Sequence, residues 1–368
     1  MEDIWRKSNK RDKIKRLGVV VMESITIKDV ARICNVSVST VSRAINNSPD
    51  ISSETREKIM QVVRDNYFVP NNNARNLKRS ESKTIAVLIK GIDNAFFSPI
   101  ISTLEKEIQK RKYTFILQRV EQNQDEIDVA IALEKEKKLK GIIFLGGYFS
   151  HAKDKLLKMT VPYVLCTVGV KDKLPCRLSG AVSVDDVAES RKMVDYLCSL
   201  GHKDIAIITS SPQDESIGTM RFDGYRQALE KNGIEFDEKL AIIINDEQHR
   251  YSMKNGYLSM KKLLNTGKKI TAVFAITDSL AIGACKALNE AGLRVPEDIS
   301  VAGYDGLELA EYYIPSLTTI AQPVERIAKE TLKILFKIIS GDDTETYKVF
   351  QGELIVGGST KRINQSVS

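Results

Sequence analysis

Two short helical patterns, separated by a two-residue turn between Thr26 and Asn47, constrain the fold of this chain more than any other feature. Apolar side chains recur there at helical spacing, which predicts that both helices bury one shared face. We expect Asp29–Cys34 to form the first helix and Ser37–Ile45 the second, with Ser37 as its N-cap. The apolar face consists of Val30, Ala31, Ile33, Val36, Val41 and Ile45.

The second predicted helix has an outward face of small or forked side chains and no carboxylate. Short hydroxyl groups suit phosphate oxygens, and a guanidinium suits the edge of a guanine in the major groove. The face can therefore lie against a polyanion, although a purely structural helical hairpin would have a similar pattern. Its members are Val38, Ser39, Ser42, Arg43 and Asn46.

The residues that follow weaken the purely structural interpretation. A third amphipathic pattern covers Thr55–Val63, and Pro70 and Asn71 end it before the polar stretch Asn72–Leu77. The motifs are, in order, TIxDVAxxxxVSxxTVSRxxN, TREK and PNxxARxL, and their spacing runs without a gap. Together they resemble the DNA-binding head of the lac repressor family.

This resemblance implies a role for each exposed side chain of the head. Val38, Ser39 and Arg43 would read bases in the major groove of a pseudo-palindromic operator bound by a homodimer. Asn72–Leu77 would form a hinge helix, and Leu77 would insert between bases from the minor groove. The positions implied to contact phosphates are Thr26, Ser37, Thr40, Ser42, Asn46 and Ser52.

Length and charge agree with a DNA-binding protein of two or three domains. A chain of 368 residues is too long for one core. Residues 1–82 contain 16 Lys and Arg against 10 Asp and Glu, whereas the remaining 286 residues contain 39 against 38. Most of the net charge of +7 therefore lies in the N-terminal 82 residues, part of it in the first 16, which favours attraction to phosphates.

Several other classes of protein find no support in the sequence. No apolar run reaches the roughly 18 residues of a membrane span, and no apolar signal segment lies near the N-terminus. Five scattered cysteines without a CxxC pair predict reduced thiols in a cytoplasmic protein. The three histidines are too far apart in sequence to indicate a ligand cluster, so we expect no metal and no cofactor.

The first 21 residues do not fit the family pattern. They are polar and basic, and Met22 lies where heads of this family usually begin, so we expect Met22 to be the natural start. A basic arm that touches DNA is the alternative. Disorder is expected before residue 22 in either case. The head would then cover 22–70, and the hinge helix and linker would cover 71–82.

Beyond residue 83, apolar runs of four to six residues alternate with amphipathic helical segments. This alternation predicts parallel sheets with helices on both faces, and ten strands suit two such sheets better than one. The predicted strands are Thr84–Ile89, Tyr113–Leu117, Gly141–Leu145, Tyr163–Cys166, Val182–Val184, Asp204–Ile208, Ala241–Ile244, Ala272–Ala275, Ile299–Ala302 and Leu317–Ile320.

Residues 83–360 resemble the sensor module of the same family, which is similar to periplasmic sugar-binding proteins. Matching pieces include RFDGYRQAL, VFAITDSLAIGACKAL and GYDGLELAEYYIPSLTTI. The resemblance implies two doubly wound subdomains joined by three chain crossings, with a sugar or sugar derivative bound between them as effector. The first subdomain would hold about 83–201 and 323–341, and the second about 202–322 and 342–360.

Residues just beyond the carboxyl ends of the predicted strands are the candidate effector contacts, because ligands of open α/β sheets bind there. Phe96 and Phe97 could stack on the ligand or cap a core. Arg221 could grip hydroxyls or a carboxylate, or remain a surface charge. Asp305 could accept from ligand hydroxyls or bond its own turn. The resemblance implies the ligand role for these four, and adds the position of Thr277.

Some positions depart from the family pattern and leave the identity of the ligand open. Asp278 is expected to N-cap a helix that begins at Ser279. Thr277, which precedes it, lacks the side-chain amide that is common at this position in the family. The departures also keep open a regulator that is controlled by a phosphorylated carrier protein. They are Ala95, Glu189, Ser190, Thr277 and Gly357.

Enzyme signatures are missing from the sequence. It has no GxGxxG after the first strand, no Walker loop, no GxSxG and no HExxH. We therefore predict a DNA-binding transcription regulator, a repressor rather than an enzyme, whose operator affinity an effector controls. The competing classes are a sugar sensor without DNA function and an α/β enzyme, and the enzyme would need a nucleotide cradle.

Overall fold

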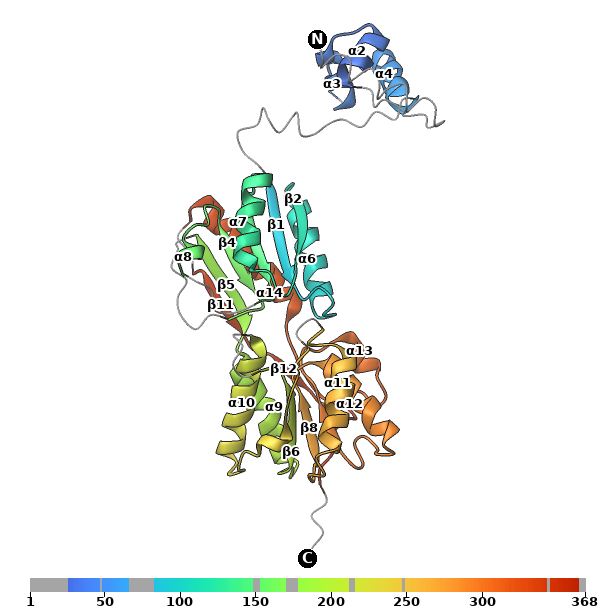
Figure 1. The fold of residues 1–368 in the computed structure, drawn as a ribbon. Coiled ribbons are helices and arrows are strands. Elements are labelled where there is room, and N and C mark those ends of the chain that lie inside the picture. The colour runs from blue at the N-terminus through green and yellow to red at the C-terminus, as the bar shows by residue number, and fades with distance from the viewer. Residues whose placement is uncertain are drawn as a thin grey trace, which may run out of the picture. The chain divides into compact units, whose positions relative to one another are not determined.

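The computed structural model divides into two compact units, Met1–Ser80 and Glu81–Ser368 (Figure 1). It describes residues 26–46, 48–65, 83–147, 153–169, 178–211, 216–246, 249–342 and 345–363. The predicted extension 1–21, the hinge helix and Leu77 lie outside the described residues.

The first unit contains three helices around a small apolar core. They are α2 (Ile27–Cys34), α3 (Val38–Ile45) and α4 (Ser53–Asp65), and Asn35 makes the turn between α2 and α3 with a φ of 56°. The prediction that Ile33 belongs to the shared core is wrong, because its side chain is 50% exposed. It lies to the side of the inward stripe on α2, whose last member is Cys34. The buried core consists of Val30, Ala31, Cys34, Val41, Ala44 and Ile59.

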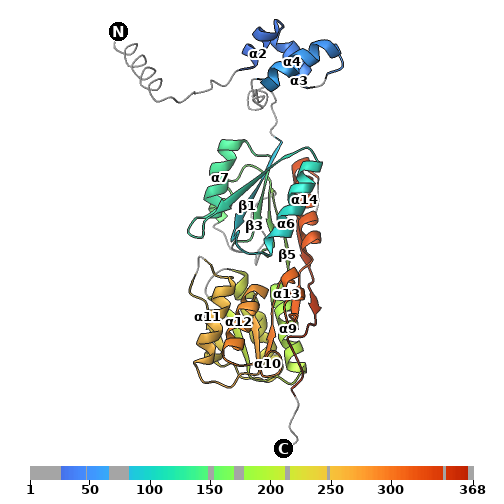
Figure 2. The same ribbon diagram turned by 90° about the vertical axis from the view of Figure 1, so that its right-hand side faces the viewer.

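The second unit begins with a six-stranded parallel sheet in the order β11-β5-β4-β3-β1-β2. Helices α6 (Phe97–Lys110) and α14 (Val324–Ser340) cover one face, and α7 (Glu126–Lys137) covers the other (Figure 2). The short helix α8 (Lys153–Leu156) packs on the same side as α7 through Leu156. Because both faces are covered, the inner strands are apolar without alternation. The strands are β1 (Thr84–Lys90), β2 (Thr114–Val120), β3 (Gly141–Leu145), β4 (Tyr163–Cys166), β5 (Ser179–Val184) and β11 (Tyr347–Phe350).

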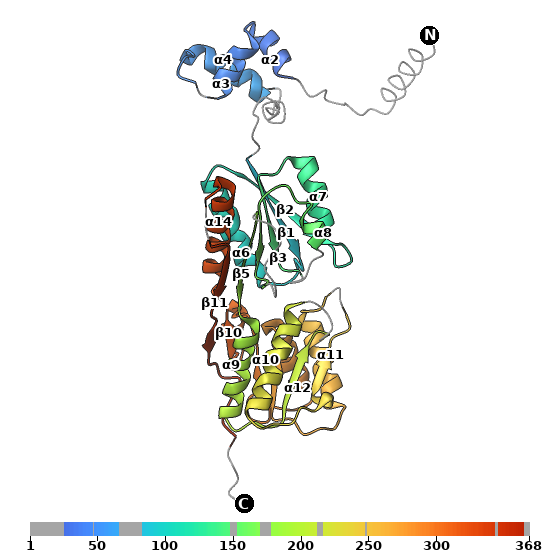
Figure 3. The same cartoon turned by 90° about the vertical axis from the view of Figure 1, so that its left-hand side faces the viewer.

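A four-stranded parallel sheet in the order β7-β6-β8-β9 forms the second subdomain. Helices α9 (Asp186–Ser199) and α10 (Ile217–Lys231) pack side by side, as do α11 (Met253–Leu264) and α12 (Asp278–Glu290) (Figure 3). The smaller elements are η1 (Glu238–Leu240) and α13 (Glu308–Tyr312). The strands are β6 (Ile205–Thr209), β7 (Ala241–Ile243), β8 (Ala272–Ala275) and β9 (Ser300–Ala302).

A two-stranded antiparallel sheet, β10 (Thr319–Ala321) with β12 (Glu353–Ile355), lies beside the second subdomain. The chain passes between the subdomains from β5 to α9, from β10 to α14 and from β11 to β12. The doubly wound fold predicted from the sequence is confirmed. The antiparallel pair was not predicted, because each of its strands is only three residues long.

Two predicted subdomain boundaries are wrong. Residues 186–201 were assigned to the first subdomain, but Met193, Val194 and Leu197 of α9 are buried in the second core against α10. Residues 347–350 were assigned to the second subdomain, but β11 pairs with β5 at the edge of the first sheet. This strand was missed because it is only four residues long and Lys348 interrupts its apolar residues.

Neither a membrane helix nor a metal cluster is present in the part of the chain that the structure describes. No helix there is both long and apolar enough to cross a bilayer. No group of three or more His, Cys, Asp or Glu side chains is arranged to hold a metal ion there.

Candidate functional site

Helix α3 presents the polar face that the sequence predicted. Ser37 is its N-cap and accepts a hydrogen bond from the backbone N–H of Thr40 at 3.1 Å. Val41 and Ala44 are buried against α2 and α4, so the opposite side of α3 is free of core contacts. Val38, Ser39 and Arg43 lie exposed on that side. A helix with such a face has the dimensions and donors to enter a major groove.

Most of the predicted phosphate contacts also have structural roles at helix ends. Thr26 precedes α2, and its hydroxyl donates to Asp29 Oδ2 at 2.7 Å. Ser52 precedes α4 and accepts from the backbone N–H of Thr55 at 3.3 Å. Asn46 ends α3, and its amide donates to the Ser42 carbonyl. Thr26 and Ser52 therefore lie at helix N-termini, where exposed backbone N–H groups also attract anions, whereas Asn46 lies at a C-terminus.

A cavity of about 580 Å³ lies between the two subdomains, within the size range of sites for small molecules. It brings together Phe96, Phe97, Arg221 and Asp305, which the sequence placed after separate strands. Further residues that line it are Lys90, Gly91, Ile92, Asp93, Asn94, Arg119, Val120, Glu121, Gln122, Asn123, Gly146, Gly147, Thr167, Val168, Ser216, Ile217, His249, Arg250, Tyr251, Ser252 and Gln322.

Arg221 forms the floor of this cavity and is almost fully buried. It lies in the second turn of α10, and its Nε donates to Asp186 Oδ1 at 2.8 Å. Its Nη1 donates to the Ile276 carbonyl at 2.6 Å and to Asp305 Oδ1 at 3.3 Å. The guanidinium also stacks on the ring of Tyr304, 3.6 Å from its centroid. Although burial alone would lower the pKa of Arg221, the charges of Asp186 and Asp305 raise it, so this side chain is a fixed cation.

Asp305 is the second anchor of the floor and has a strained backbone. Its φ of 117° lies in a region that side chains other than glycine rarely adopt, and such strain gathers at functional sites. Oδ1 accepts from the Gln322 amide at 2.9 Å, whereas Oδ2 is buried without a hydrogen-bond donor from the described residues. Burial raises the pKa of Asp305 to about 6, although the nearby charge of Arg221 lowers it in part.

Thr277 does not line the cavity described above. The prediction that Asp278 is the N-cap of the following helix is wrong. Thr277 itself is the N-cap of α12, because its hydroxyl accepts from the backbone N–H of Leu280 at 3.3 Å. Asp278 instead accepts from the backbone of Leu307 at 2.8 Å and from the hydroxyl of Thr319 at 2.6 Å. Burial, followed by the charge of Asp305, raises the pKa of Asp278 to about 7.

The aromatic pair forms part of the wall of the cavity. Phe96 and Phe97 lie at the start of α6 with ring centroids 5.6 Å apart, and both also pack into the core of the first sheet. The two readings of these rings, core cap and ligand contact, are therefore compatible. Gly146 is needed here, because a side chain at this position would meet Phe97 and the Lys90 carbonyl at 2.8 Å.

Sequence reasoning missed several residues at the same place. Lys90 ends β1 and pairs in the interior with Glu126 at 3.1 Å. Thr167 follows β4 with a φ of 72°, which is unusual for a β-branched residue. Gln322 follows β10, and Tyr251 precedes α11. Three of these four directly follow or end a strand, so a closer reading of strand ends could have found them.

The departures from the family pattern at Glu189 and Gly357 lie outside the lining of the cavity. Glu189 is buried near the third chain crossing and pairs with Lys192, which also donates to the Gly352 carbonyl at 3.0 Å. A side chain at Gly357 would meet the Ser316 carbonyl at 2.5 Å. Glycine at this position therefore follows from close packing of the chain.

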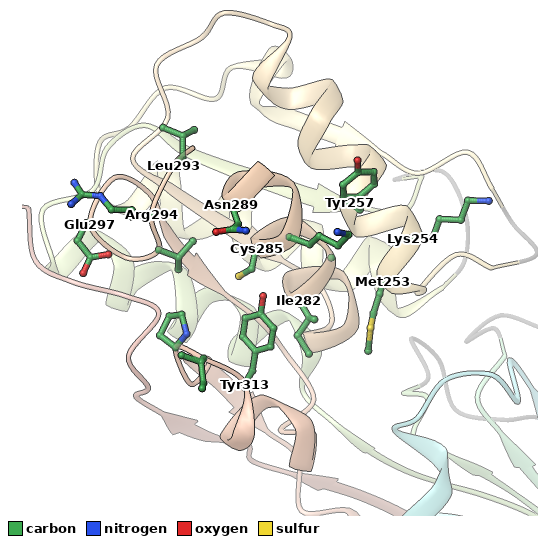
Figure 4. A pocket seen from close by; sticks show the side chains of 15 residues that line it. Met253, Lys254, Tyr257, Ile282, Cys285, Asn289, Leu293, Arg294, Glu297 and Tyr313 are labelled. Carbon is green, nitrogen blue, oxygen red and sulfur yellow. The ribbon is translucent and has the colours of Figure 1, made fainter. Parts of the chain in front are cut away.

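A second cavity, of about 860 Å³, lies on the second subdomain alone (Figure 4). Its wall includes residues of α11, α12 and the segment after α13. Cys285 of α12 and Tyr313, which follows α13, face each other there. Ile314 and Met253 also line it, although they are 90% and 42% exposed. Apolar side chains gathered on a surface in this way indicate an interaction site.

Comparison with known proteins agrees with both parts of the molecule. A model of the bacterial regulatory proteins of the lacI family matches residues 26–71, and one of the periplasmic binding protein-like domain matches residues 194–360. The HTH-type transcriptional regulator MalR of Clostridium butyricum is 39% identical over 333 residues, which cover 90% of this chain and 98% of that protein.

Solved structures extend this agreement to the fold. The complex of the transcriptional regulator CelR with cellobiose is 28% identical, with a TM-score of 0.67, and the match covers 91% of this chain and 99% of that one. The lac repressor dimer bound to operator and the anti-inducer ONPF is 25% identical, with a TM-score of 0.73 and coverage of 92% and 100%. The chain therefore belongs to the lacI family of bacterial regulatory proteins and is a DNA-binding transcription regulator rather than an enzyme.

Proposed function

We propose that this chain represses transcription by placing α3 in the major groove of an operator. Val38, Ser39 and Arg43 would read base edges, because they are exposed on the side of α3 that faces away from the core. Thr26, Ser37, Thr40, Ser42, Asn46 and Ser52 would contact phosphates, since they surround exposed helix ends.

The effector would bind between the two subdomains of the sensor. The buried Arg221–Asp305 pair on the floor of the cavity is the observation that carries this assignment, because Asp305 Oδ2 still needs a hydrogen-bond donor. Phe96, Phe97 and Tyr251 offer apolar ring surface against which a sugar can pack. The relative CelR was solved with cellobiose, which favours a sugar as the ligand here as well.

The operator-bound form would be a homodimer. The lac repressor matched above was solved as a dimer on its operator. In this chain, the exposed Ile314 and Met253 and the cavity beside them would meet the same surface of a second copy across a two-fold axis. A regulator that binds operator DNA works where the chromosome is, so we place it in the cytoplasm.

A gel-shift experiment with genomic fragments tests this function. The chain should retain a small set of fragments at moderate salt, and a sugar from a broad panel should change that retention. Arg43→Ala should lose this selectivity while still binding DNA weakly, because it keeps the phosphate contacts. If the wild-type chain retains all fragments equally, the repressor assignment is wrong.

A further inference from the structure

Glu189 carries a buried carboxylate that lies outside the lining of the effector cavity. Its side chain is only 3% exposed, and it forms an ion pair with Lys192, which follows three residues later in α9. A buried carboxylate is costly without a counter-charge, so the pair keeps the ammonium group of Lys192 beside Glu189. The position of this ammonium group is therefore set by the buried carboxylate.

Lys192 also contacts the third chain crossing, which leads from β11 to β12. Its Nζ donates to the Gly352 carbonyl at 3.0 Å, although the two residues are 160 positions apart in the chain. A side chain at Gly352 would meet Glu189 Oε2 at 3.2 Å and Ile320 Cγ2 of β10 at 2.6 Å. The carboxylate and β10 thus lie against the same glycine. The ion pair therefore fixes the path of the chain at the third crossing.

The first turn of α9 connects this contact with the floor of the effector cavity. Asp186 lies three residues before Glu189, so the two side chains are neighbours on the helix. Asp186 accepts a hydrogen bond from Arg221 Nε at 2.8 Å. Burial raises the pKa of Tyr304, whose ring stacks on Arg221, and the charge of Glu189 is among those that raise it further. One helical turn therefore contacts both the third crossing and Arg221.

Resting on the effector site proposed above, we propose that Glu189 and Lys192 are positioning residues that raise effector affinity without contacting the effector. They hold the third crossing in the conformation in which both subdomains line the cavity, so that less conformational freedom is lost when the effector binds. The pair acts on the equilibrium between conformations rather than on the contacts of the ligand. Its removal should lower effector affinity about fivefold, as residues that touch no ligand can do.

The double variant Glu189→Gln/Lys192→Met removes the pair without leaving an unpaired carboxylate in the interior. Lys231→Met is the matched control, because it also removes an ion pair of α9, the one with Asp195, in which no crossing takes part. If the double variant fails to fold, Lys192→Met alone gives the same test, since this side chain is already 41% exposed.

Hydrogen exchange of the full chain without ligand measures the crossing directly. Residues 347–355, from β11 to β12, should exchange at least about threefold faster in the double variant, because the contact with α9 is lost. Exchange in β6 should stay at the wild-type level, which shows that the core of the second subdomain is intact. Lys231→Met should leave both segments unchanged.

Calorimetry measures the affinity for a neutral sugar, taken from the panel that tests the proposed function. This sugar should bind about fivefold more weakly to the double variant, a loss of about 1 kcal/mol, and with wild-type affinity to Lys231→Met. Faster exchange with unchanged affinity would reduce the pair to a structural contact and overturn the proposal. Weaker binding with unchanged exchange would overturn it too, because the effect would not pass through the third crossing.

The same measurements separate this proposal from the proposed function. Failure of every sugar of the panel to bind the wild-type chain removes the sugar effector, and with it any control of its affinity by Glu189 and Lys192. Equal binding of a sugar by the wild type and the double variant removes only the role of the pair.

Discussion

Effector affinity should fall as the pH drops below about 6, because the ligand donates to an ionised Asp305. Burial holds the pKa of this carboxyl at about 6. Asp186, Asp278, Arg221, Tyr304 and Gln322 lie around it. Arg221 and the hydrogen bond from Gln322 lower the pKa in part, and the charge of Asp186 raises it. The ionised fraction falls from nearly all at pH 7.5 to about a tenth at pH 5, so affinity should fall about tenfold, or about 1.4 kcal/mol.

The stability of the ligand-free protein depends on pH in the opposite direction to its affinity for the ligand. Because the pKa is raised on folding, the folded state binds this proton more tightly than the unfolded chain does. The contribution of Asp305 to the free energy of unfolding is therefore full below pH 4 and lost as the pH rises through about 6. Ligand-free protein thus gains stability from this group at the acidic pH where ligand binding weakens.

Calorimetry with the neutral sugar that binds, from pH 5 to pH 8 in two buffers of different ionisation enthalpy, measures both affinity and proton release. Binding near pH 6 should release a proton, because the ligand stabilises the ionised carboxylate. Glu325→Gln should keep the same pH profile, because this exposed carboxylate pairs with Lys329 outside the lining of the cavity. Equal affinity at pH 5 and pH 7.5, or proton uptake on binding, would refute the role given to the ionised Asp305.

Three further predictions concern the head and the surface of the second subdomain. Arg43→Ala should cost about 1–3 kcal/mol on a selected operator but much less on random DNA, as measured by fluorescence anisotropy; equal losses would exclude base reading. Ile59→Ala should destabilise the head by about 2–5 kcal/mol in thermal unfolding, because it empties a fully buried position; an unchanged melting temperature would contradict this core. Ile314→Asp should shift the dimer towards monomer in sedimentation velocity, whereas Leu157→Asp, at a position on the first subdomain that is 59% exposed, should not.

Local patterns in the sequence were sufficient to predict the three helices of the head and nine of the ten parallel strands of the described residues. Ser37 and the apolar spacing of α2 and α3 fixed the head to within two residues. Ile33 was misplaced because helical spacing alone does not say which side of an apolar stripe meets the neighbouring helix. The strand β11 was missed because a four-residue edge strand interrupted by Lys348 gives too short an apolar pattern.

Contacts across long stretches of chain could not be predicted from local patterns. Arg221 and Asp305 were identified from their places after strand ends and from family resemblance, but Asp186, the other carboxylate that pairs with Arg221, was not. The role of Asp278 was also misjudged, because its partners Leu307 and Thr319 come from segments 29 and 41 residues away. Pairings of this kind depend on how two sheets and their crossings are packed.

The three chain crossings determine what kind of movement the sensor can make. The three crossings lie close together. The carbonyl of Gly352, on the third crossing, accepts a hydrogen bond from Lys192 of α9, which follows the first crossing. A side chain at Gly352 would meet the Ala321 carbonyl, next to the second crossing, at 3.3 Å. Twisting or sliding one subdomain past the other would stretch all three segments at once, whereas bending about the line through them stretches none. The easiest movement of the sensor should therefore be a hinge bending of the two subdomains about the three crossings. Gln322 lies on the second crossing and donates to Asp305, so it connects the ligand site directly to the hinge.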